Sequence, residues 1–198
     1  MAGLFKPARH GGASLTLDPV EVSILRNLSV QMLELLGPGD EPEADEDPLA
    51  RLFAEGPSKA PEDPALARLF PDAYTAGEDY GEGEDAGELS AEFRRFTEND
   101  LRARKRDDAL AVVRSLDGAG SDRKGRSQVQ LDKDGCTHWL GGLNDLRLTL
   151  GSRLEVSDDP EEAEAMYRLP DEDPRKPLMM AYLWLGGLQE TLIEAMAR

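Results

Sequence analysis

The chain has 198 residues and a formal net charge of −17, with 40 acidic and 23 basic side chains. A charge of this sign opposes the phosphate backbone of nucleic acids and the surface of an anionic membrane. No run approaches the roughly 20 apolar residues that cross a bilayer. The single cysteine, Cys136, cannot form an internal disulfide, and the opening residues contain no apolar run resembling a signal peptide. These features predict a cytoplasmic protein without membrane contact.

Residues 1–37 predict a β-hairpin followed by a helix, both part of the core domain. Two short extended runs flank His10-Gly11-Gly12, and paired glycines supply the positive φ angles of a tight turn. Asp18-Pro19 is typical of a helix start, because the acid caps the helix and proline needs no amide donor there. Apolar residues then recur at helical spacing until Gly37-Pro38: Leu25, Leu28, Met32, Leu35 and Leu36. This amphipathic helix needs a partner surface later in the chain.

Residues 38–88 predict an acidic, disordered linker. Between residues 38 and 92, 17 acidic residues stand against three basic ones, so this stretch carries −14 of the total charge. It is also rich in Gly and Pro, and its few apolar residues offer little burial to offset the entropy of ordering it.

The linker contains a near-repeat, DPLARLF at 47–53 and DPALARLF at 63–70. Each copy can form about two helical turns with Leu and Phe on one side, as short docking motifs do. The candidate partner-binding residues here are Leu52, Phe53, Leu69 and Phe70. Two interpretations stay open. In the first, one copy packs on the domain's own core and the other copy only extends the linker. In the second, the copy that does not pack on the core is available to a partner.

A long helix is predicted from Ser90, because strong helix formers continue without Gly or Pro until Gly118. Residues 93–126 hold ten basic and six acidic side chains, a local charge of +4. Four basic residues lie close together: Arg102, Arg104, Lys105 and Arg106. They suggest a nucleic-acid contact, but interrupting aspartates and the overall charge favour a solvated helix face or one touched by the acidic linker.

The rest of residues 89–198 completes a helical core. Ser127 to Leu131 alternates polar and apolar residues and predicts a third strand beside the hairpin. Three helices follow: one from Asp132 or Asp134 to Gly151, a short acidic one from Asp159 to about Arg168, and one from Leu178 to Met196. The predicted fold class is therefore mainly α (α+β), a helical bundle with a small N-terminal hairpin or three-stranded sheet.

The sequence WLGGL occurs twice, at 139–143 and 184–188, and both tryptophans fall on the apolar stripes of predicted helices. Glycine inside a helix costs about 1 kcal/mol relative to alanine, and close helix crossing is the usual compensation. We expect each Trp to cover the Gly-Gly step of the other helix. The alternative is a ligand slot against bare backbone.

Polar residues interrupt the helix that carries the first WLGGL. The candidates are Asn144, Arg147 and Arg153, the last directly after the predicted helix end. They either satisfy polar groups of neighbouring helices or form an anion- or peptide-binding face. Both interpretations stay open.

Catalytic and cofactor-binding patterns are lacking in the sequence. Two histidines and one cysteine are too few for a metal site, and Cys136 and His138 diverge on a helix. We therefore expect no enzyme activity, no metal and no cofactor. The predicted function is an interaction or regulatory protein with a protein partner, a second copy of the chain being one candidate. The alternative is a DNA-associated transcriptional regulator that uses residues 102–106.

Three stretches resemble a known family: LDPVEVSILRNL at 17–28, EFRRFTENDLRARKRDDA at 92–109 and LNDLRLTLGSRL at 143–154. The family is actinobacterial and is classed as a domain of unknown function. Its members are typically encoded beside the adaptor of the Clp protease, and some are labelled transcriptional regulators. The resemblance implies no catalytic residues. In the family pattern a single DPxxRLFP-like segment precedes the long helix, so the doubled segment is a departure.

Overall fold

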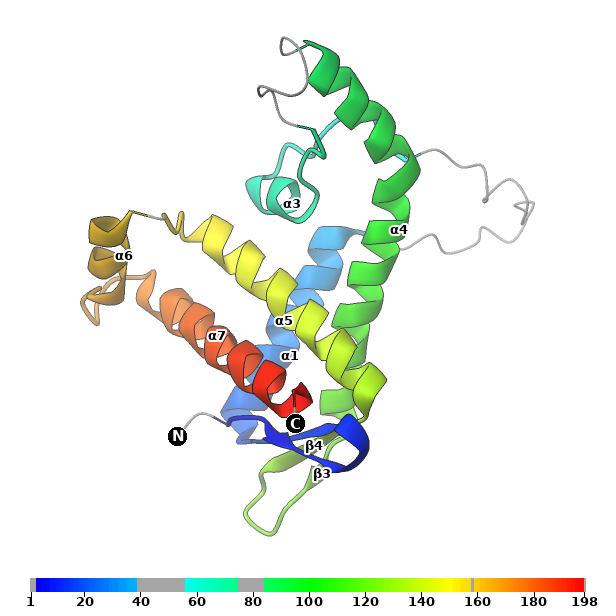
Figure 1. Ribbon diagram of the computed structural model, residues 1–198. Coiled ribbons are helices and arrows are strands. Elements are labelled where there is room, and N and C mark those ends of the chain that lie inside the picture. The colour runs from blue at the N-terminus through cyan, green and yellow to red at the C-terminus, as the bar shows by residue number, and fades with distance from the viewer. Residues whose placement is uncertain (1–2, 39–55, 75–83, 158, 198) are drawn as a thin grey trace.

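The computed structural model describes residues 3–38, 56–74, 84–157 and 159–197. The described helices are α1 (Pro19–Leu36), α3 (Pro64–Leu69), α4 (Glu84–Asp117), α5 (Lys133–Arg153), α6 (Pro160–Tyr167) and α7 (Lys176–Met196). They form a bundle with a small sheet at one end (Figure 1). The predicted class, mainly α with α+β character, is confirmed.

The sheet has four antiparallel strands in the order β1-β2-β4-β3, where three were expected. They are β1 (Lys6–Pro7), β2 (Ala13–Leu17), β3 (Gly120–Ser121) and β4 (Ser127–Leu131). The additional strand, β3, has only two residues, and Gly120 pairs with Gln128 across a turn where Gly125 has a φ of 73°. So short a strand has no alternating pattern to reveal it in the sequence. Alternate residues of β2 and β4 point into the core.

The first helix follows the predicted design. Asp18 caps α1 by accepting from the backbone of Val20 and Glu21, and the Glu21 side chain bonds back to the Asp18 amide. The helix ends at Leu36 and is followed by Gly37, whose φ of 79° favours glycine. Its apolar side packs mainly on α4.

Part of the predicted linker is ordered. Residues 56–74 are described, and α3 within them packs on α5. Ala65, Leu69 and Phe70 are 0%, 3% and 2% exposed. In the structure this part differs from the expected disorder, because three apolar side chains of one short segment are buried against the rest of the chain. α4 also begins six residues earlier than expected, at Glu84, and its N-terminal half extends past the bundle beside α3 (Figure 1).

The two WLGGL motifs serve different purposes. Trp139 is fully buried, as expected, with its ring edge-on to Phe5 and its indole N–H donated to Ser115. Trp184 is only half-buried and lines an apolar groove between α1 and α7 with Ile24 and Met180. The expectation that each tryptophan covers the other helix's glycines is wrong.

The glycines instead admit polar side chains. A Cβ on Gly141 would lie 2.3 Å from Oδ2 of Asp108, and one on Gly142 would lie 3.0 Å from Val112, so the first pair lets α4 approach α5. Gly186 of α7 lies under the guanidinium of Arg147, with 3.7 Å between its added Cβ and Cζ. A Cβ on Gly187 meets nothing within 4 Å. The added Cβ on Gly186 would make only ordinary van der Waals contact, so of the four glycines only Gly141 and Gly142 have a packing reason.

The predicted end of α5 at Gly151 is also wrong, because the helix continues to Arg153. A Cβ on Gly151 would lie 3.4 Å from the ring of Tyr182 on α7. This glycine therefore marks a helix contact and not a helix stop.

Replacing single glycines tests this division. We expect Gly141→Ala to cost on the order of 2 kcal/mol, because the new methyl group collides with the buried Asp108 carboxylate. The matched Gly187→Ala has open space and better helix propensity, so it should be neutral or stabilise by up to about 1 kcal/mol. Chemical denaturation measures both values. Equal costs would show that the α4–α5 approach is not what requires Gly141.

Candidate functional site

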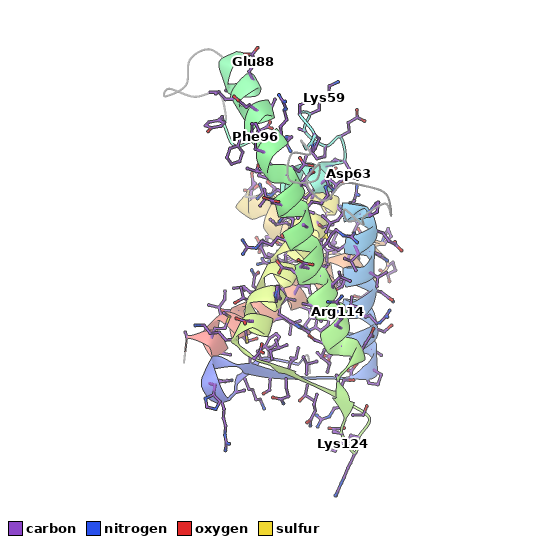
Figure 2. The ribbon with its side chains drawn as sticks, turned by 90° about the vertical axis from the view of Figure 1, so that its right-hand side faces the viewer. Lys59, Asp63, Glu88, Phe96, Arg114 and Lys124 are labelled. Atoms are coloured by element: carbon purple, nitrogen blue, oxygen red, sulfur yellow. The ribbon has the colours of Figure 1, made fainter. Side chains whose placement is uncertain are left out.

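The second Leu-Phe segment occupies a cleft formed by α4 and α5. Asp63 caps α3 by accepting from the amides of Ala65 and Leu66, and it also accepts from Nη2 of Arg153 at 2.7 Å. The hydrogen bond from Arg153 is the main reason that the pKa of Asp63 lies below its ordinary value. In the view of Figure 2, the labels place Asp63 and Phe96 on opposite sides of the α4 ribbon. The start of the segment is therefore tied to the end of α5.

The other end of the segment is held by arginines of α4. The Arg102 guanidinium lies 4.5 Å from the centre of the Phe70 ring, and Arg94 donates to the Phe70 carbonyl oxygen at 3.1 Å. Arg94 also bonds Asp72 and the buried Glu98, at 2.7 and 2.6 Å. We call this surface, with Arg94, Arg102 and Lys105 of α4 and Arg153 of α5, the α3 cleft.

The basic stretch of α4 is mostly used inside the protein. Arg102 donates to the Leu36 carbonyl oxygen at 2.7 Å, and Arg106 donates to the carbonyl oxygens of Leu33 and Gly37. These carbonyls belong to the C-terminal end of α1, where no further turn supplies donors and where positive charge is favoured. Of the four clustered basic residues, Arg104 is the exposed one.

Lys105 joins α4 to α5 through a buried ion pair. Its Nζ lies 2.7 Å from Oδ1 of Asp145, whose side chain is 6% exposed. Burial raises the pKa of Asp145, which Lys105 opposes and the nearby Asp108 reinforces. Asp108 in turn lies 2.7 Å from Nδ1 of His138. This interface needs its counter-charges, because a buried carboxylate without a partner is strongly unfavourable.

Asn144 and Arg147 face α7 and not the α3 cleft. Arg147 donates to Oε1 of Gln189 at 2.6 Å and lies 5.2 Å from the ring centre of Tyr182. Gln189 also bonds Oδ1 of Asn144, at 3.5 Å. The contacts favour the structural interpretation of these two residues, which fasten α5 to α7. The Arg147 guanidinium also borders a pocket of about 540 Å³ between α3, α5 and α7.

The structure thus brings together three of the seven candidate residues. Leu69, Phe70 and Arg153 meet at the α3 cleft, whereas Asn144 and Arg147 lie at the α5–α7 contact. Leu52 and Phe53 lie outside the described residues. Sequence reasoning missed Arg94 and Glu98. Their only signal was an ion-pair spacing of four residues, which is common on solvated helices.

The described part of the chain offers little for catalysis. Cys136 is fully buried and burial raises its thiol pKa, while the His138 ring is paired with Asp108. Among the described residues no group of three or more His, Cys, Asp or Glu side chains is placed to hold a metal ion. In the same residues no helix has both the length and the apolarity to cross a membrane.

Removing Lys105 tests the buried ion pair. We expect Lys105→Met to lower the free energy of unfolding by on the order of 3 kcal/mol at pH 7, because Asp145 keeps a buried charge without its partner. A raised pKa in the folded state means that folding favours the protonated acid. The penalty should therefore shrink as the pH falls through the raised pKa of Asp145.

Urea denaturation at several pH values measures that penalty. The control, Arg26→Met, removes an exposed ion pair with Asp117 and should change stability little. A penalty for Lys105→Met that does not depend on pH would contradict the explanation by buried charge.

Comparisons with known proteins place the chain in a family. The oxidative stress regulators AosR of Mycobacterium tuberculosis and Mycobacterium bovis are each 32% identical to it over 184 residues, which cover 90% of this chain and 79% of theirs. No solved structure matches. The family model described as a domain of unknown function, DUF2017, matches residues 1–196. The chain therefore belongs to the DUF2017 family.

Proposed function

We propose that the chain is a regulatory protein without enzymatic activity that acts by binding a protein partner in the cytoplasm. The names of the mycobacterial relatives concern regulation under oxidative stress. Regulation by an interaction protein fits a chain whose described residues place no nucleophile beside a positioned base and hold no metal-binding cluster.

One observation carries the proposal. The sequence LARLF occurs twice, and the described copy buries its Leu69 and Phe70 almost completely in the α3 cleft. That cleft is filled by this copy. Leu52 and Phe53 of the other copy carry the same two anchor side chains, and a buried aromatic and a leucine are the usual anchors of a short docking motif. We infer that the copy with Leu52 and Phe53 docks into a groove on a partner protein.

The contacts of the basic stretch weigh against the DNA-binding alternative. Of its four side chains, Arg102, Lys105 and Arg106 are occupied by carbonyl oxygens, carboxylates or the Phe70 ring. Freeing them for phosphate would leave the end of α1 and the buried Asp145 unsatisfied. A net charge of −17 adds repulsion to that cost.

Direct sensing of oxidants by a thiol is also disfavoured for this chain. Thiolates, and not thiols, are the reactive form, and the fully buried Cys136 has a raised pKa. The chain contains no second cysteine with which it could close a disulfide. A response to oxidative stress would therefore reach this protein through its partner.

The paired anchors allow a direct comparison. We expect Leu52→Ala with Phe53→Ala to abolish recovery of bound partner from cells while leaving the melting temperature close to that of the wild type. The control pair Pro42→Ala with Glu43→Ala, in the same acidic stretch, should keep the partner. Crosslinking before affinity recovery, followed by mass spectrometry, measures this. Equal partner recovery from both double variants would contradict the proposal.

A further inference from the structure

The segment in the α3 cleft is held there as a bound peptide would be. α3 has six residues, and isolated helices shorter than about 12–15 residues are marginal in water. Its helical form therefore depends on the contacts of Asp63 with Arg153 and of Phe70 with Arg102. The segment has little reason to be helical outside the cleft.

One part of the cleft, around Lys105, is held together by contacts that do not involve this segment. α4 and α5 pack directly on one another, and Lys105–Asp145 and Asp108–His138 link them. Both polar contacts lie within α4 and α5, and neither uses residues 56–74. This part of the cleft therefore does not depend on residues 56–74 for its own α4–α5 contacts.

The first copy reproduces the groups that the cleft recognises. Residues 49–53 and 66–70 are both LARLF, so Phe53 offers the ring that Arg102 covers in Phe70. Asp72, the partner of Arg94, lies two residues after Phe70, and Glu55 lies two residues after Phe53. The ring and the carboxylate thus have the same spacing in both copies.

The copies differ at their capping acids. Asp63 lies three residues before the LARLF leucine Leu66, whereas Asp47 lies two residues before Leu49. One helical residue corresponds to about 1.5 Å along the axis and 100° around it. With Phe53 seated, Asp47 would therefore miss the position from which Asp63 bonds Arg153. Residues 47–55 should bind the cleft less tightly than residues 63–72.

The chain also keeps the first copy near the cleft. The Gly56 amide donates to the carbonyl oxygen of Arg95 at 2.7 Å, one residue from the cleft residue Arg94. Phe53 precedes Gly56 by three residues, which span at most about 11 Å. A tether this short gives a high effective concentration, so even weak affinity leads to occupancy when the cleft is free.

We propose that the α3 cleft is a peptide-binding site for a short helix that ends in Leu-Phe followed by an acid, and that residues 47–55 are its second occupant. They enter the cleft when residues 63–72 leave it. The exchange itself needs no partner protein. Where the proposed function holds, this exchange decides which copy is available to a partner. It also keeps the cleft filled with one copy while the partner binds the other copy.

Four forms of the full chain test the exchange: the wild type, Leu52→Ala/Phe53→Ala, Leu69→Ala/Phe70→Ala, and all four substitutions together. We expect the first pair alone to leave the unfolding midpoint unchanged and the second pair to lower it. The unfolding midpoint of the combined variant should fall by more than the sum of the two separate shifts, because only in that variant does neither copy keep the anchors that fill the cleft. Additive shifts would overturn the proposal.

A milder variant covers the case in which the combined variant does not fold. Arg153→Ala removes a contact that only residues 63–72 can make and keeps both pairs of anchors. Amide hydrogen exchange should then show faster exchange at residues 65–70 and slower exchange at residues 49–53 than in the wild type. The control is Arg168→Ala, at an exposed arginine. Unchanged exchange at 49–53 in Arg153→Ala would overturn the proposal, and neither test depends on recovering a partner.

Discussion

The basic side chains along one side of α4 hold the rest of the structure in place. Arg102 and Arg106 supply donors to the open end of α1, Lys105 balances the buried Asp145 of α5, and Arg94 holds the chain after α3. Three elements that are distant in sequence therefore meet on one helix. Each of these contacts joins a charged donor to an acceptor at least partly shielded from water, where hydrogen bonds to charged groups are strong.

This arrangement also explains how a chain with a charge of −17 uses most of a basic cluster in contacts within the protein. A positively charged helix attracts the acidic parts of its own chain, and Asp72 and Glu98 pair with Arg94. Some of the acidic side chains and the basic side chains of α4 therefore pair with one another inside the protein.

Local signals made much of the fold predictable. The Asp18 cap, the Gly37 stop and the apolar stripe that contains Trp139 depend on neighbours within a few residues, and all three are confirmed. The order of residues 56–74 was not predictable, since composition indicated a linker and the contacts of this segment are with α4 and α5, which are distant in sequence. The difference in burial between Trp139 and Trp184 likewise depends on which elements pack over each ring. The WLGGL motif is identical in both places and therefore cannot predict that difference.

The candidate site shows the same division. The repeat identified Leu69 and Phe70, because a duplicated pair of apolar anchors is visible in the sequence. Arg102 was expected on a solvated helix face or one touched by the acidic linker, with a nucleic-acid contact as the alternative, and its partners, the Leu36 carbonyl and the Phe70 ring, lie 66 and 32 residues away in the chain. Only the folded chain could show that its charge is already used.

The most direct test of this view is the thermal stability of Arg102→Lys. Lysine keeps the positive charge but loses the planar group that bonds Leu36 and Glu98 while covering Phe70. We expect the melting temperature to fall by several degrees, whereas Arg104→Lys, at an exposed position, should leave it unchanged. Equal melting temperatures for the two variants, with weaker binding of duplex DNA by Arg102→Lys, would contradict a structural role for the basic stretch.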